Sequence, residues 1–275
     1  PLTKDVEDMA LVLNAITGYD KLDSSSYNKK YEDFSENLKK DIKGKKVALP
    51  KEYFSDGIQP EIKEKVIDVA KKLEELGAIV EEVSMNMTDL ALPAYYLISS
   101  AEASSNLARY DGVKYGYRAN NYDNLVDLYK QTRDEGFGKE VKRRIMLGTY
   151  ALSSGYYDAY YKKAQQVRTL IKNEFDKVFE KYDCLLTPTT PSTAFNFGDK
   201  VDDPLSMYLS DVFTIPVNLA GIPALSMPFG MIKNKPVGLQ LIGKAFTEGK
   251  LLKVGYALEQ NTELTRPKPA LEGVM

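Results

Sequence analysis

DVFTIPVNLAGIPALSMPFGMIKNKPVGLQLIG, residues 211–243, decides the fold. The stretch holds two apolar runs, 224–229 and 237–242, joined by a short polar link that contains Asn234. Glycine and proline punctuate the segment just upstream of the first run. Apolar runs of this length on either side of a polar link predict a pair of strands that follows a Gly- and Pro-rich loop.

A strand–helix–strand unit is expected near the start of the chain. Residues 46–49 and 78–83 have the apolar character of short strands. Between them, the pattern of 60–76 predicts a helix that Pro60 begins and Gly77 ends. Two strands connected through a helix are usually parallel neighbours in one sheet, so we predict a parallel pair here.

Three further elements complete the expected layer structure. Residues 183–186 predict a buried strand, and 248–260 predict a last helix. Thr3 is expected to cap an N-terminal helix that runs through Leu13.

The middle of the chain, about 88–181, is almost entirely helical in pattern, with breaks near 111–116 and 136–138. Strands and helices alternate on either side of it. The predicted fold class is therefore α/β, a mixed β-sheet flanked by helices, with a large helical insertion inside a single domain over 1–275.

Composition excludes several kinds of chemistry. Lys and Arg number 37 against 39 Asp and Glu, so no global positive field is available to hold nucleic acid. Histidine is absent, which excludes a Ser-His-Asp triad and any His-ligated metal. A nucleophile would have to be Ser or Thr with a Lys, Asp or Tyr base. With one Cys and no His, we expect no metal site in this chain. No Gly-rich phosphate loop follows a strand, so we also expect no nucleotide cofactor.

Cysteine use points to a reducing compartment. Cys184 is the only cysteine, so no disulfide framework exists within the chain, which fits the cytosol. The thiol lies in the apolar run DCLLTP, and we expect it to be buried and inert. The longest uncharged apolar runs are too short to span a bilayer, so no membrane partner is expected.

Three motifs within the stretch 211–243 carry a family resemblance. They are NLAGIP at 218–223, SMPFG at 226–230 and PVGLQLIG at 236–243. Together they resemble the C-terminal part of the amidase-signature family. The resemblance implies the amidase-signature fold and cleavage of amide bonds by a Ser nucleophile with a Lys base.

The helical middle is similar to one glutamine-hydrolysing branch of that family. The similarity rests on RYDGVKYGYR at 109–118, the long run at 134–168, and DDPLSMYLSD at 202–211. The similarity implies that the chain is part of one subunit of a tRNA-dependent amidotransferase. That subunit hydrolyses glutamine and passes the ammonia to a partner subunit. That partner uses ATP and Mg to activate the glutamate carried on tRNA(Gln), and it makes most of the tRNA contact. A small third subunit clamps the other two.

The catalytic Ser and Lys residues of the family lie upstream of the motif that begins here at Pro1. The chain opens with PLTKDV and no Met, which looks like a cut inside a longer protein. Ser99, Ser100, Ser153 and Ser154 fall within helical patterns without an adjacent base, and we interpret them as packing residues. No catalytic residue is therefore expected in this chain.

Arg144 is the candidate cation for a glutamine carboxylate. It is the last charge on its helix before the uncharged run 145–157. Gly148 and Ala151, one and two turns on, are small and are expected to leave room beside it. A guanidinium at the edge of a buried helix can hold a carboxylate with two hydrogen bonds. A surface position or a structural ion pair is the alternative, and Arg143 competes for the role; the resemblance implies Arg144.

The resemblance supplies two more binding residues. Asp211 precedes an otherwise uncharged run, and from the pattern alone it would be the N-cap of the turn that follows. The resemblance implies that it binds the substrate ammonium. Tyr95, in LPAYYLISS, would otherwise be a core aromatic; the resemblance implies that it lines the same pocket.

Three functions remain open. The first is the substrate-binding part of the glutaminase subunit. The second is a fragment of a stand-alone amidase that acts on another small amide, since the motifs of 218–243 are shared across the family. The third is a non-enzymatic assembly module. The opposite charges of Arg144 and Asp211 favour the glutaminase function, because an apolar amide has no charged groups for them to bind.

Overall fold

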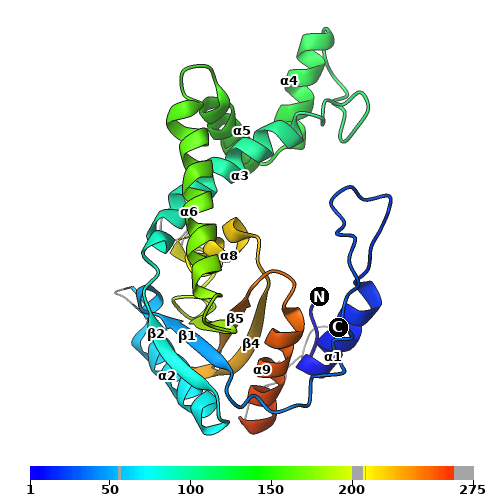
Figure 1. The fold of residues 1–275 in the computed structure, drawn as a ribbon. Coiled ribbons are helices and arrows are strands. Elements are labelled where there is room, and N and C mark those ends of the chain that lie inside the picture. The colour runs from blue at the N-terminus through cyan, green and yellow to red at the C-terminus, as the bar shows by residue number, and fades with distance from the viewer. Residues whose placement is uncertain (55–56, 200–206, 208, 263–275) are drawn as a thin grey trace, which may run out of the picture. The chain divides into compact units, whose positions relative to one another are not determined.

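The structure, a computed structural model, describes residues 1–54, 57–199, 207 and 209–262. Most of the DDPLSMYLSD motif lies outside these residues. The chain divides into two compact units, drawn in Figure 1. The sheet unit comprises Pro1–Thr88 and Lys172–Met275, and the helical unit comprises Asp89–Ile171. The boundary falls within helix α6, Lys163–Val178.

The sheet unit is built on five strands in the order β2-β1-β3-β5-β4. β1 (Lys46–Pro50) pairs in parallel with both β2 (Ile79–Val83) and β3 (Cys184–Pro188). β3 and β5 (Lys235–Gly243) are antiparallel, as are β5 and β4 (Ala224–Ile232). The predicted parallel pair and the predicted mixed sheet are both confirmed.

The β4–β5 hairpin explains the polar link of the decisive stretch. Ile232 pairs with Lys235, which leaves Lys233 and Asn234 as a two-residue turn. Both turn residues have positive φ, 48° and 62°. A turn with positive φ at both central positions matches the right-handed twist of the strands it joins, and asparagine tolerates that conformation well.

Two helices cover one face of the sheet. α2 (Pro60–Glu75) packs against β2 and β3, and α9 (Glu248–Asn261) packs beside it against β4 and β5 (Figure 1). α2 ends where Gly77 takes a φ of 89°, a conformation that favours glycine. Buried side chains from these helices and strands form the core, among them Val47, Val66, Leu73, Leu186, Leu241 and Leu252.

α1 (Val6–Ile16) packs against α9. The prediction that Thr3 caps this helix is wrong. Asp5 is the N-cap, and its carboxylate accepts a hydrogen bond from the Asp8 N–H at 2.7 Å. The Thr3 hydroxyl instead donates to the carbonyl of Asp5 at 2.8 Å. A carboxylate also suits the positive end of the helix dipole, which favours Asp5 as cap.

Short helical elements complete the sheet unit. Two are 3-10 turns, η1 (Lys51–Phe54) and η2 (Asn86–Leu90). The last two residues of η2 already belong to the helical unit. The third, α8 (Ile215–Ala220), is a helix of the Gly- and Pro-rich loop before β4, and it ends at Gly221 with a φ of 67°.

The helical unit contains α3 (Ala91–Leu107), α4 (Leu125–Gly136), α5 (Lys139–Leu152), the π-helical turn η3 (Asp158–Lys162) and the first half of α6. α3 and α5 form its main packing contact. The break between α3 and α4 is longer than the predicted one, because the segment 108–124 folds as turns. Arg133 stabilises it by donating to the carbonyls of Leu107 and Tyr110.

Candidate functional site

Asp211 lies at the start of the turn that leads into α8. Its main-chain carbonyl accepts hydrogen bonds from the N–H groups of Thr214 and Ile215 at 3.0 and 3.1 Å. The N-cap of α8 is Thr214, so Asp211 does not cap this helix with its side chain. The residue is exposed, and its carboxylate has no hydrogen-bond or ion-pair partner in the part of the chain that the structure describes. It is therefore available to an ammonium group.

The turn after Asp211 is anchored from within the sheet unit. The buried side-chain amide of Gln240, on β5, donates to the carbonyl of Phe213 at 2.8 Å and to that of Pro188 at 3.3 Å. The ring of Phe213 stacks on buried Tyr53, with centroids 5.2 Å apart. Sequence reasoning missed Gln240 as an individual residue, although a polar residue inside the buried strand 237–242 was the signal that could have found it.

Tyr53 is held as a neutral phenol. Burial, with the negative charges of Glu174 and Glu52 adding to it, raises the pKa of Tyr53 far above its ordinary range. Its hydroxyl has no hydrogen-bond partner among the described residues. Its part in the site is therefore to support the ring of Phe213 rather than to act as a base.

Arg143 and Arg144 share one carboxylate on α5. Arg143 contacts both oxygens of Glu140, through Nε and Nη2 at 3.0 Å each. Arg144 makes a single bond, from Nε to Oε1 at 3.2 Å. Among the described residues, the terminal nitrogens of Arg144 have no acceptor. They are thus the part of this charge cluster that can bind a further carboxylate, the geometry that guanidinium suits.

The expectation that Gly148 and Ala151 leave room beside Arg144 is wrong. Both residues are buried, and a Cβ placed on Gly148 would lie 1.9 Å from the carbonyl oxygen of Ser100 on α3. Because Gly148 has no side chain, the backbones of α5 and α3 can approach closely at this point. The space that the sequence suggested for a ligand is filled by α3.

Tyr95 lies on α3, partly buried, with its ring at 5.2 Å and nearly perpendicular to that of Tyr96. Tyr95 and Arg144 thus belong to the two helices that pack together in the helical unit, whereas Asp211 belongs to the sheet unit. A pocket that unites the three residues remains a prediction.

The structure describes the surroundings of Ser99, Ser153 and Cys184. The Ser99 hydroxyl is buried without a partner among the described residues, and the Ser153 hydroxyl donates to the carbonyl of Tyr150 at 2.7 Å. Ser153 is the residue that ends α5 rather than an interior helical position, a correction to the sequence-based view. Cys184 is buried as expected, and burial raises the pKa of its thiol to about 12, which disfavours the reactive thiolate.

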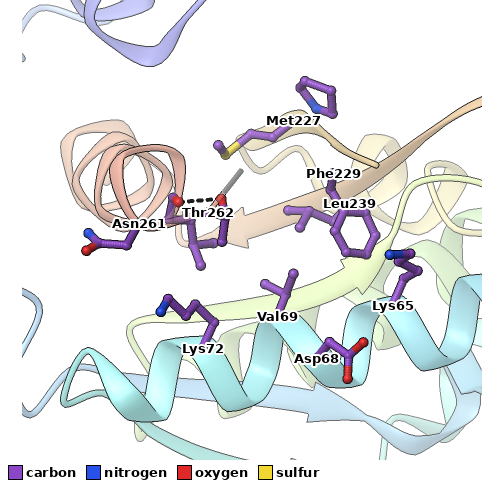
Figure 2. A pocket seen from close by; sticks show the side chains of 11 residues that line it. Lys65, Asp68, Val69, Lys72, Met227, Phe229, Leu239, Asn261 and Thr262 are labelled. Atoms are coloured by element: carbon purple, nitrogen blue, oxygen red, sulfur yellow. Dashed lines mark hydrogen bonds between the residues drawn. The ribbon is translucent and has the colours of Figure 1, made fainter. Parts of the chain in front are cut away.

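A hollow of about 300 Å³ lies in the sheet unit between α2, α9 and the hairpin strands (Figure 2). Apolar side chains form its floor, including Val69, Met227, Phe229 and Leu239. Thr262 supplies a hydroxyl, which donates to the carbonyl of Leu258 (Figure 2). None of the three predicted binding residues lines this hollow, and we do not assign it to amide chemistry.

In the residues that the structure describes, no three His, Cys, Asp or Glu side chains come together as a metal site would require. No helix of the same residues is both long and apolar enough to cross a membrane.

The family of the chain follows from comparison with known proteins. The family model described as Amidase matches residues 1–252. The chain belongs to the amidase family. A bacterial aryl acylamidase of known structure, 24% identical with a TM-score of 0.75 over 94% of this chain and 52% of that one, supports the fold.

Within the family, the chain is similar to proteins that share one name. It is 62% identical over 271 residues to the A subunit of glutamyl-tRNA(Gln) amidotransferase from Desulforamulus reducens, and 59% identical to the protein of the same name from Halalkalibacterium halodurans. Each match covers 98% of this chain and 56% of the relative, so the chain spans little more than half the length of these relatives. The crystal structure of the corresponding A subunit from Thermotoga maritima is 41% identical, with a TM-score of 0.75 over 95% of this chain and 52% of that one.

Proposed function

We propose that this chain is the glutamine-recognition part of a protein that hydrolyses glutamine for a tRNA-dependent amidotransferase. The observation that carries the proposal is the similarity, over 98% of the chain, to proteins named as the A subunit of glutamyl-tRNA(Gln) amidotransferase. In this role the ammonia released from glutamine converts Glu-tRNA(Gln) to Gln-tRNA(Gln).

Three residues bind the substrate in this proposal. Glutamine presents an α-carboxylate and an α-ammonium, so its pocket needs one fixed cation and one fixed anion. The terminal nitrogens of Arg144 take the carboxylate, while Glu140 holds the guanidinium through Nε. The exposed carboxylate of Asp211 takes the ammonium, and Tyr95 lines the pocket.

We propose that the chemical step uses groups from outside this chain. Amide hydrolysis needs an activated nucleophile and hydrogen-bond donors aimed at the developing oxyanion. In the family resemblance both come from the Ser- and Lys-containing segment upstream of the matched motifs. We therefore propose that the longer protein, and not this chain alone, has glutaminase activity.

The proposed protein works in the cytoplasm as one of three subunits. A kinase-like partner binds ATP, Mg and tRNA and consumes the ammonia, and a small third protein clamps the pair. A stand-alone amidase is the second candidate, because the family model is shared by enzymes for other amides.

Substrate choice separates the two candidates. The longer protein is assayed with glutamine, with its α-deamino and α-decarboxy analogues, and with propionamide as an apolar amide. The proposed function predicts that removal of either α-group lowers kcat/KM at least tenfold, about the value of one charged hydrogen bond. Equal turnover of propionamide and glutamine would favour the stand-alone amidase.

A further inference from the structure

Gln240 is the polar residue in the buried part of β5. β5 is buried at every position from Leu239 to Gly243, and Gln240 is 3% exposed. Burying a primary amide is costly unless its hydrogen bonds are made. Here Nε2 makes two, to the carbonyls of Phe213 and Pro188. The amide therefore ties β5 and the end of β3 to the turn before α8.

The turn that Gln240 reaches is the one that carries Asp211. Phe213 lies inside this turn, which is closed by the bonds from Thr214 and Ile215 to the carbonyl of Asp211. The Thr214 hydroxyl also donates to that carbonyl at 3.1 Å. The hydrogen bond from Gln240 to the carbonyl of Phe213 therefore restrains the main chain two residues after Asp211, whose carboxylate is exposed.

A second contact holds the same turn from another direction. Phe213 is 8% exposed, and its ring stacks on Tyr53 of η1 with planes inclined by 22°. The ring and the carbonyl of one residue are thus both restrained, the first by η1 and the second by β5. Such double restraint is what a preorganised binding group requires, since misplacement by about 1 Å is costly in binding and catalysis.

We infer that Gln240 is a positioning residue for substrate binding, which holds the Asp211 turn so that the carboxylate meets the substrate ammonium. This inference rests on the proposed function for the role of Asp211. The restraint of the turn itself is a property of this chain alone.

The first test measures the turn in the chain as it exists. Hydrogen–deuterium exchange is followed for the amides of Thr214 and Ile215 in the original chain and in Gln240→Met, which keeps the side-chain size and removes both donors. We expect these amides to exchange about tenfold faster in the variant, about the value of one hydrogen bond, while amides of β1 and α9 are unchanged. Unchanged exchange in the turn would overturn the inference.

A matched control comes from the neighbouring strand. Thr187 is the cross-strand partner of Gln240, is fully buried, and has a hydroxyl without a partner among the described residues. Thr187→Val removes a buried polar group from the same place without removing a bond to the turn, so exchange at Ile215 should stay as in the original chain. If Gln240→Met does not fold, Gln240→Leu also removes both donors and leaves no polar group at this buried position. Faster exchange spread evenly over all regions of either variant would overturn the inference.

The second test asks whether the restraint serves binding. In the longer protein within its complex, Gln240→Met should raise KM for glutamine about tenfold and leave activity with added ammonia unchanged, with Thr187→Val neutral. If Asp211→Asn raises KM and Gln240→Met does not, the inference fails while the proposed function stands. If Asp211→Asn leaves KM unchanged, the proposed function fails, and the exchange data still decide whether Gln240 holds the turn.

Discussion

Arg144 pairs with Glu140 one turn earlier on α5, with Nε 3.2 Å from Oε1. The same carboxylate receives two bonds from Arg143. Glu140 therefore engages Arg143 through two nitrogens and Arg144 through one. This difference favours Arg144 over Arg143 in the proposed role of carboxylate ligand, on grounds separate from the family resemblance.

Replacing Arg144 with alanine in the longer protein should raise KM for glutamine by about 10- to 100-fold, since a charged hydrogen bond contributes about 1.5–3 kcal/mol. Arg143→Ala is the matched control, because it removes an equal charge from the same cluster. Its KM should change much less. Steady-state kinetics with glutamine measure both, and a larger effect of Arg143→Ala would show that the assignment is reversed.

Asp211→Asn should weaken glutamine binding by a similar factor and spare ammonia as nitrogen donor. The amide keeps the size of the side chain and removes the charge that pairs with the substrate ammonium, whereas free ammonia does not use this pocket. Formation of Gln-tRNA(Gln) with each donor is the measurement. Loss of the ammonia-dependent reaction would indicate that Asp211 serves the structure of the turn.

Gly148→Ala should destabilise the helical packing by about 1–3 kcal/mol, because the added methyl would overlap the Ser100 carbonyl and force α3 and α5 apart. Gly138→Ala is the control on the same helix. Beyond its chain neighbours, no atom lies within 4 Å of a Cβ placed there, and the cost should be at most about 1 kcal/mol as a change of N-cap. Urea unfolding of the two variants compares them, and equal midpoints would contradict the observed packing.

Asp183 should make stability depend on pH in the acid range. Burial alone would raise its pKa, but the Lys46 N–H and the ammonium groups of Lys45 and Lys250 outweigh it and lower the pKa. A lowered folded pKa contributes stability above the unfolded pKa of about 3.9, which is lost as the pH falls through the folded value.

The matching variant is Asp183→Asn. The original chain should be more stable by about 1–2 kcal/mol at pH 7, and the difference should shrink below about pH 4. Urea unfolding across this range gives the comparison. If the stability advantage of the original chain over Asp183→Asn increased as the pH falls, the ion pairs of Asp183 could not be its cause.

Much of the fold follows from local pattern. Pro60 and Gly77 correctly predict the two ends of α2, and Asn234 correctly predicts the hairpin turn. The backbone angles that these residue types favour do not depend on distant contacts. Local rules did not identify the N-cap of α1, because both Thr3 and Asp5 are residue types that can cap a helix. They also failed for 108–124, whose turns depend on Arg133 from a later helix.

The candidate site was less accessible to sequence reasoning. A small residue such as Gly148 signals close approach, but the pattern does not say whether a ligand or another helix approaches. The sequence shows two adjacent arginines, Arg143 and Arg144. How unequally they share Glu140 depends on side-chain geometry, which the sequence does not give. Gln240 acts on residues 27 and 52 positions away, a contact that no local pattern encodes.

Ammonia release from glutamine by the highly purified 275-residue chain tests the central claim most directly, namely that the chain recognises substrate without containing the nucleophile. We predict no turnover, with or without ATP, tRNA or added metal. A double variant, Ser153→Ala with Ser154→Ala, serves as the control for the serines at the end of α5. Turnover by the original chain that disappears in the double variant would place a nucleophile within these residues and contradict the account.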